Sequence, residues 1–123
     1  MKTQKIFLLT FLFFGLIISA FAQKGSSFPA MKTETIKVWG NCGMCKKTIE
    51  KAAYSKNVNY ASWNEDTKML TVKYPLVGAT NSDIIQRAVA AAGYDTEKFT
   101  ASNEAYNKLR NCCQYDRKTQ AQQ

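Results

Sequence analysis

The chain has 123 residues, with 17 lysines and arginines against 9 aspartates and glutamates, four cysteines and no histidine. This length allows one small domain. The lack of histidine excludes catalytic pairs that need an imidazole and metal sites with histidine ligands, so sulfur must bind any soft metal.

Residues 1–22 have the pattern of a secretory signal peptide. Lys2 and Lys5 precede an apolar run over residues 6–18, and Ala20 and Ala22 form a small-residue cleavage motif. We expect cleavage near Ala22 and a periplasmic or secreted protein. The apolar run is shorter than the ~20 residues of a membrane-spanning helix, so we expect no stable membrane insertion after cleavage. A retained membrane anchor is the alternative.

Residues 23–32, with one glycine, two serines and a proline, predict a flexible linker. The domain is expected over residues 33–100. Residues 33–38 alternate as a half-buried strand does, and from Cys45 the apolar residues Cys45, Ile49 and Ala52 recur with the period of a helix. These patterns predict a strand followed by an amphipathic helix.

The second half of the domain is predicted to contain a hairpin, a helix and a last strand. Residues 58–63 and 69–74 predict a hairpin joined by polar turn residues. Thr80 opens a capping-box-like motif before a helix that Gly93 ends, and residues 96–100 predict a last strand. The order indicates an α+β sandwich, in which two helices lie on one face of an antiparallel sheet.

Residues 101–123 form a C-terminal tail that carries a cysteine pair. Ser102 can start a helix in which Tyr106 and Leu109 share a face with Cys112 or Cys113. We expect this helical tail to dock on the domain and to fray from Arg117 onward.

The candidate metal site is the pair Cys42 and Cys45, where the first strand gives way to the first helix. Free backbone amides and the helix dipole favour the thiolate there. Two thiolates three residues apart can bind one soft ion, with Cu(I) or Hg(II) favoured over harder cations. The expected surroundings of the two ligands are Asn41, Gly43 and Lys46.

The chain resembles the heavy-metal-associated domain, a family that includes copper chaperones and periplasmic mercury-binding proteins. The resemblance spans about residues 33–99 and rests on the C-x-x-C loop with Lys46, the hairpin, and the segment that ends in Gly93 and Tyr94. It implies a ferredoxin-like βαββαβ fold, with Cys42 and Cys45 as ligands and Tyr94 close behind them. The family's Met before the first cysteine is replaced by Gly40 here.

Three further sulfurs remain open as ligands. Met44 lies between the two cysteines and is either a third ligand or a packing residue. Cys112 and Cys113 could complete the site of Cys42 and Cys45, form a second metal site, or form disulfides with the first pair. Their participation would shift the preferred ion towards Zn(II) or Cd(II).

The sequence thus predicts an exported, monomeric, non-enzymatic protein that binds a soft metal ion and transfers it by ligand exchange to a membrane transporter or another metal carrier. The alternatives are a thiol-disulfide redox module and a small domain stabilised by disulfides without metal. The hairpin after the first helix disfavours a thioredoxin-like topology. Nucleic acid is not expected as a partner, because the charge is modest and the arginines are not clustered.

Overall fold

The computed structural model describes residue 25 and residues 27–118, so the predicted signal peptide and the end of the tail lie outside the described residues. Among the described residues, none of the helices has the length and apolar character needed to cross a membrane.

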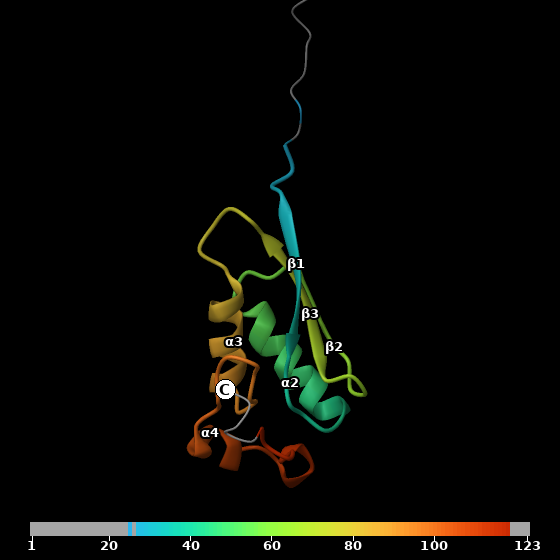
Figure 1. Ribbon diagram of the computed structural model, residues 1–123, viewed down its shortest axis with the longest axis vertical. Helices are drawn as coiled ribbons and strands as arrows, with labels where there is room; N and C mark the ends of the chain where they lie inside the picture. Colours follow the sequence, from blue (N-terminus) through green and yellow to red (C-terminus); the bar gives the residue numbers. More distant parts are fainter. Residues whose placement is uncertain (1–24, 26, 119–123) are drawn as a thin grey trace, which may run out of the picture.

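A three-stranded antiparallel sheet forms one layer (Figure 1). The strands are β1 (Met31–Lys37), β2 (Tyr60–Trp63) and β3 (Met69–Pro75), and their order in the sheet is β1-β3-β2. β1 begins two residues before the predicted strand. The predicted hairpin is confirmed, and the Asn64 side chain closes its turn by accepting hydrogen bonds from the backbone amides of Asp66 and Thr67.

Two long helices form the second layer, α2 (Gly43–Tyr54) and α3 (Ser82–Ala91). α2 buries Cys45 and Ile49 as the sequence predicts, but the third buried residue is Ala53, while the predicted Ala52 is only partly buried. The start of α3 differs from the prediction by one residue. Asn81 caps it by accepting from the Ile84 amide, whereas the Thr80 hydroxyl donates to the Lys56 carbonyl oxygen.

The core lies between the sheet and the two helices, and Trp63 is its largest fully buried side chain. The indole Nε1 of Trp63 donates to the Val38 carbonyl oxygen at 3.1 Å, which satisfies its one polar atom inside the core. This contact fixes the end of β1 immediately before the loop that leads into α2.

The predicted strand over residues 96–100 is wrong in extent. In the described part of the chain it is reduced to a single antiparallel bridge between Val38 and Thr96 beside β1. The amide of Thr96 donates to the Phe99 carbonyl oxygen at 2.8 Å, and the Phe99 amide donates to the Thr96 hydroxyl. The chain therefore turns back after one pair instead of continuing along the sheet. The α+β, ferredoxin-like architecture is otherwise as predicted.

The tail folds against the end of the domain where β1 leads into α2 (Figure 1). It contains a short helix, α4 (Asn103–Asn107), and a 3-10 turn, η2 (Asn111–Cys113). Ser102 caps α4 as predicted, but α4 ends before Leu109, so the two tail cysteines lie on η2 and not on a continuous helix. The tail docks as expected.

Candidate metal centre

Cys42 occupies the N-cap position of α2. Its backbone is extended, with φ −144° and ψ 175°, and the helix begins at the next residue. The backbone amides of Cys45 and Met44 lower the pKa of the Cys42 thiol below its usual value, because they stabilise the thiolate at the helix start. The side chain is partly exposed. Cys42 is thus both reachable and readily ionised.

Cys45 lies one helical turn further on and is fully buried. Its sulfur accepts a hydrogen bond from the Asn41 amide at 3.4 Å, and it lies 3.7 Å from the sulfur of Cys42. The two sulfurs of the C-x-x-C motif therefore converge, with Cys42 on the solvent side and Cys45 on the core side.

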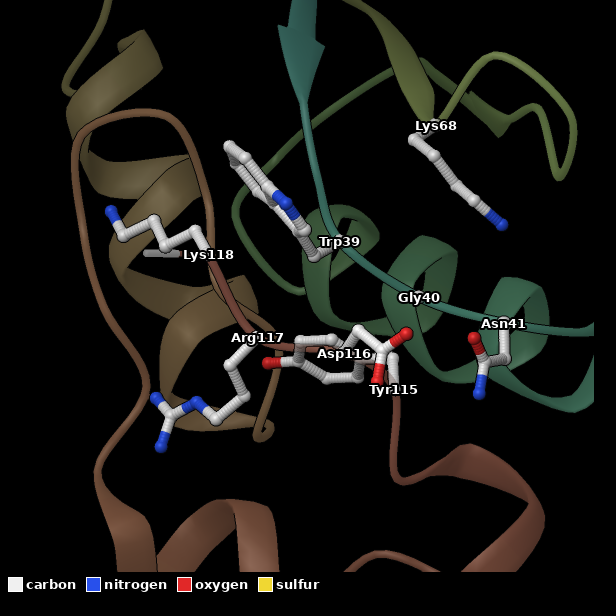
Figure 2. A pocket seen from close by; sticks show the side chains of 8 residues that line it. All are labelled: Trp39, Gly40, Asn41, Lys68, Tyr115, Asp116, Arg117 and Lys118. Atoms are coloured by element: carbon white, nitrogen blue, oxygen red, sulfur yellow. The ribbon is translucent and has the colours of Figure 1, made fainter. Parts of the chain in front are cut away.

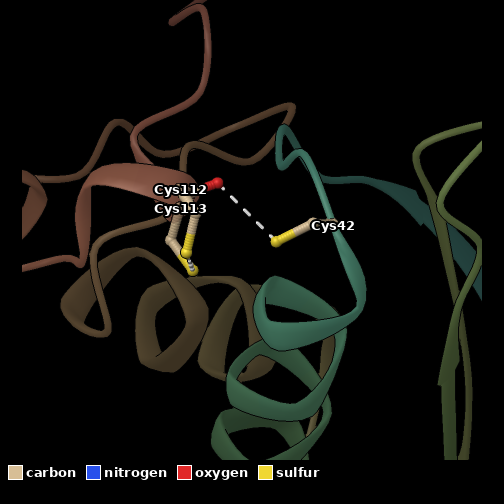
Figure 3. A group of neighbouring side chains, drawn as sticks. All are labelled: Cys42, Cys112 and Cys113. Carbon is tan, nitrogen blue, oxygen red and sulfur yellow. Dashed lines mark hydrogen bonds between the residues drawn. The ribbon is translucent and has the colours of Figure 1, made fainter.

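The tail brings two more thiols to this point. The sulfurs of Cys42, Cys112 and Cys113 all lie within 4.8 Å of one another, and Figure 3 shows the tail pair facing Cys42. The sulfurs of Cys112 and Cys113 are 4.0 Å apart, and the Cys42 thiol donates to the Cys112 carbonyl oxygen at 3.6 Å. All four cysteines are free thiols. Cysteines separated by 70 residues in sequence form one sulfur cluster.

Tyr94 lies behind the cluster, on the core side. It is fully buried, and its hydroxyl lacks a hydrogen-bond partner within the described part of the chain. Burial raises the pKa of Tyr94, and the adjacent thiols of Cys45 and Cys113 raise it further. A neutral phenol is a donor, so Tyr94 can donate to a cysteine sulfur once that sulfur carries negative charge.

Of the two thiols whose pKa is shifted, Cys42 and Cys113, the thiol of Cys113 is the less acidic. Burial, followed by the neighbouring Cys45, raises the pKa of Cys113 to about 12. Cys113 is therefore a protonated thiol at neutral pH.

The other predicted neighbours occupy distinct positions. Met44 is 41% exposed, and its sulfur is 3.9 Å from that of Cys112. Asn41 donates from its side chain to the Gln114 carbonyl oxygen at 3.4 Å, which links the loop to the tail. Gly43 is the first residue of α2 and borders open space.

Lys46 turns away from the sulfurs. Its ammonium group donates to the Glu50 carboxylate at 2.5 Å and to the Trp63 carbonyl oxygen at 2.6 Å. Its charge is thus compensated by Glu50, and the acidity of Cys42 comes from the backbone amides at the helix start.

A second group of residues, which has no signal in the sequence, holds the tail. Asp95 is fully buried, and its carboxylate accepts from Arg117 at 2.7 and 3.0 Å and from the Ala101 amide at 2.8 Å. The Tyr115 hydroxyl accepts from the Asp95 amide and donates to the Gly93 carbonyl oxygen. The prediction that the chain frays from Arg117 is wrong for Arg117 itself and for Lys118, which is buried and donates to the Thr96 carbonyl oxygen.

These contacts fix the tail beside the loop between β1 and α2. Figure 2 shows the last described residues on one side of a hollow, with the loop on the other; the lining residues are Trp39, Gly40, Asn41, Lys68, Tyr115, Asp116, Arg117 and Lys118. Neither the acidic residue nor its basic partner is marked by a sequence motif, because 22 residues separate them. The position of the tail cysteines follows from this group.

The comparisons with known proteins agree with this fold. A solved structure described as "CopZ metallochaperone" is similar to this chain with a TM-score of 0.50 and 27% sequence identity, over 53% of this chain and 98% of that one. No family model matches the chain, and no curated protein matches it. The similarity supports a fold like that of this metallochaperone, and the cysteine cluster is a candidate for metal binding.

Proposed function

We propose that this protein is an exported, non-enzymatic carrier that binds a soft metal ion through Cys42 and Cys45 and transfers it by ligand exchange. The observation that carries the proposal is the convergence of the two sulfurs, 3.7 Å apart, at the start of α2. Sulfur ligands without any histidine select Cu(I), Hg(II) and similar ions.

The burial of the two sulfurs suits transfer. Cys42 is partly exposed, so an incoming thiolate of another protein can reach an ion bound there, whereas Cys45 is buried and holds the ion from the core side. The ion can therefore gain a new ligand before it loses an old one. We propose a membrane transporter or a second metal carrier as the partner, and export through residues 1–22 as the route to the periplasm or beyond.

Cu(I) binding by purified, reduced protein tests this function. We expect one Cu(I) per chain by mass spectrometry, and a loss of at least 100-fold in affinity, or about 2.7 kcal/mol, in the variant Cys42→Ser/Cys45→Ser. A double variant that binds Cu(I) as tightly as the parent would place the ion elsewhere and refute the proposal.

A thiol-disulfide redox module would use the same two sulfurs, so the assay needs a second arm. The carrier function predicts no turnover of insulin or glutathione disulfide by the reduced protein. Turnover that depends on Cys42 and persists with a chelator would show that the dithiol works as a redox pair.

A further inference from the structure

We propose that Cys112 and Cys113 are ligands of the ion bound by Cys42 and Cys45, and that the tail, residues 102–118, is a clamp that carries them to it. This inference rests on the proposed function. The completed site has four thiolates from two segments and takes a single thiophilic ion, with Cd(II) and Zn(II) accommodated as well as Cu(I).

The spacing of the sulfurs fits one ion. Four sulfurs at bonds of about 2.3 Å around a tetrahedral ion lie about 3.8 Å apart, and three in a plane lie about 4.0 Å apart. The sulfur pairs Cys42–Cys45 and Cys112–Cys113 are separated by 3.7 and 4.0 Å, and Cys42 lies within 4.8 Å of both tail sulfurs. Cys45 is not part of the group whose sulfurs all lie within 4.8 Å of one another, so a four-thiolate site requires Cys45 and the tail sulfurs to move closer when the ion binds.

The vicinal cysteines face the site instead of each other. Adjacent cysteines form a disulfide only through a strained ring, so the pair stays available as thiols. Cys113 points inward and is 4% exposed, next to Cys45, whereas Cys112 is exposed and its sulfur contacts that of Met44. The 3-10 turn η2 thus presents one thiol on the core side and one on the solvent side, as the start of α2 does with its own pair.

A buried hydroxyl lies beside the inner thiols. The Tyr94 hydroxyl is buried without a partner within the described residues, and the thiols beside it belong to Cys45 from α2 and Cys113 from the tail. An unsatisfied buried hydroxyl is destabilising, and a neutral thiol is a poor acceptor. When an ion displaces the protons of these thiols into solvent, the thiolates become strong acceptors for the hydroxyl. One donor therefore serves ligands from both segments.

The tail is anchored well enough to act as part of the site. The Asp95–Arg117 ion pair is buried on the carboxylate side, and Tyr115 stacks on Tyr94 with ring centroids 5.6 Å apart. If the ion pair were its sole anchor, the tail would leave Cys112 and Cys113 free to move away. The residues before the two cysteines belong to α4, and Tyr115 after them packs against the ring of Tyr106, so the tail is held on both sides of the cysteines.

Thiol protection measures the number of ligands directly. Purified, reduced protein receives one equivalent of Cd(II) or, separately, Cu(I), is then treated with iodoacetamide, and the alkylated cysteines are counted and located by mass spectrometry. We expect all four thiols of the parent to be protected by Cd(II). In the variant Cys112→Ser/Cys113→Ser we expect two protected thiols, about half the thiolate-to-Cd(II) absorbance, and an affinity at least tenfold lower.

Two controls separate folding from ligation. The variant Met44→Leu keeps the side-chain volume near Cys112 and should leave the thiol count at four. The single variant Cys112→Ser changes only an exposed side chain, and should lower the count to three with an unchanged circular dichroism spectrum.

The outcomes distinguish this inference from the proposed function. Alkylation of both tail cysteines in the Cd(II)-loaded and Cu(I)-loaded parent would overturn the clamp while leaving Cys42 and Cys45 as the site. Retention of tight binding by the Cys42→Ser/Cys45→Ser variant would overturn the proposed function as well. A tail variant with the affinity and absorbance of the parent also refutes the clamp.

Discussion

The ion pair between Asp95 and Arg117 should contribute more to the free energy of unfolding than any other charge pair described in this protein. The Asp95 side chain is fully buried and that of Arg117 is 23% exposed, so removal of the guanidinium leaves an interior carboxylate whose one remaining partner among residues 27–118 is the Ala101 amide. Breaking a buried pair from one side costs about 3–5 kcal/mol. Because Arg117 is partly exposed, the lower end of this range applies, and we predict that Arg117→Gln lowers the free energy of unfolding by about 3 kcal/mol.

Thermal unfolding followed by circular dichroism measures this loss. In a domain of this size, 1 kcal/mol corresponds to about 4–8 °C, so the melting temperature of Arg117→Gln should fall by about 12–24 °C. The matched control is Lys108→Gln, which breaks an exposed pair with Glu104 and should cost less than about 0.5 kcal/mol.

A double-mutant cycle decides whether the loss comes from the unpaired charge. Asp95→Asn in the Arg117→Gln background removes that charge and should recover part of the lost stability. Two results would contradict the buried-charge explanation. One is that Arg117→Gln destabilises the protein no more than Lys108→Gln does. The other is that Asp95→Asn lowers the melting temperature in the Arg117→Gln background as much as it does in the parent.

Three other outcomes are expected. Iodoacetamide should modify Cys42 first and Cys113 last, and the pH midpoint of the Cys42 reaction should lie below that of the same thiol in the urea-unfolded chain. Because the pKa of Cys113 is raised to about 12, the contribution of Cys113 to the free energy of unfolding should be full below the ordinary thiol pKa and should fall as the pH rises towards 12. Gly93→Ala should destabilise by about 1–3 kcal/mol, since φ is +104° and its Cβ would lie 2.9 Å from a backbone oxygen of α4, while Gly43→Ala, in open space, should be nearly neutral in the same melts. Cys112→Ser with Cys113→Ser should release Cu(I) to a competing chelator at least tenfold faster in stopped-flow measurements; an equal rate contradicts a role of the tail in retention.

The parts of the fold that the sequence predicts are those set by local periodicity. Alternation around Ile36 predicts β1, and the recurrence of Cys45 and Ile49 predicts α2, because burial of one face decides both patterns. The cap of α3 was misplaced by one residue, since Thr80 and Asn81 are both good capping residues and only the backbone path selects between them.

The parts that the sequence does not predict depend on contacts between distant residues. Residues 96–100 have the composition of a strand, yet the turn between Thr96 and Phe99 ends the pairing after one bridge. Arg117 lies in a polar segment that composition assigns to a frayed end, and only its pairing with Asp95 makes it part of the folded structure. The C-x-x-C ligands are local in sequence and were predicted as candidates, whereas the approach of the tail cysteines was one of three open alternatives.

The arrangement of the four sulfurs suggests how an ion would enter and leave. Cys42 and Cys112 lie on the solvent side, and Cys45 and Cys113 on the core side, so each segment contributes one outer and one inner thiol. In the proposed site, an ion that arrives from solvent or from a partner would meet the outer pair first, and the inner pair would then complete its coordination. Release runs in the opposite order, and an incoming thiolate has access only to an ion still bound by the outer pair. In the proposed four-thiolate site, retention would depend on the inner thiols, of which one belongs to the tail, so displacement of the tail should govern transfer.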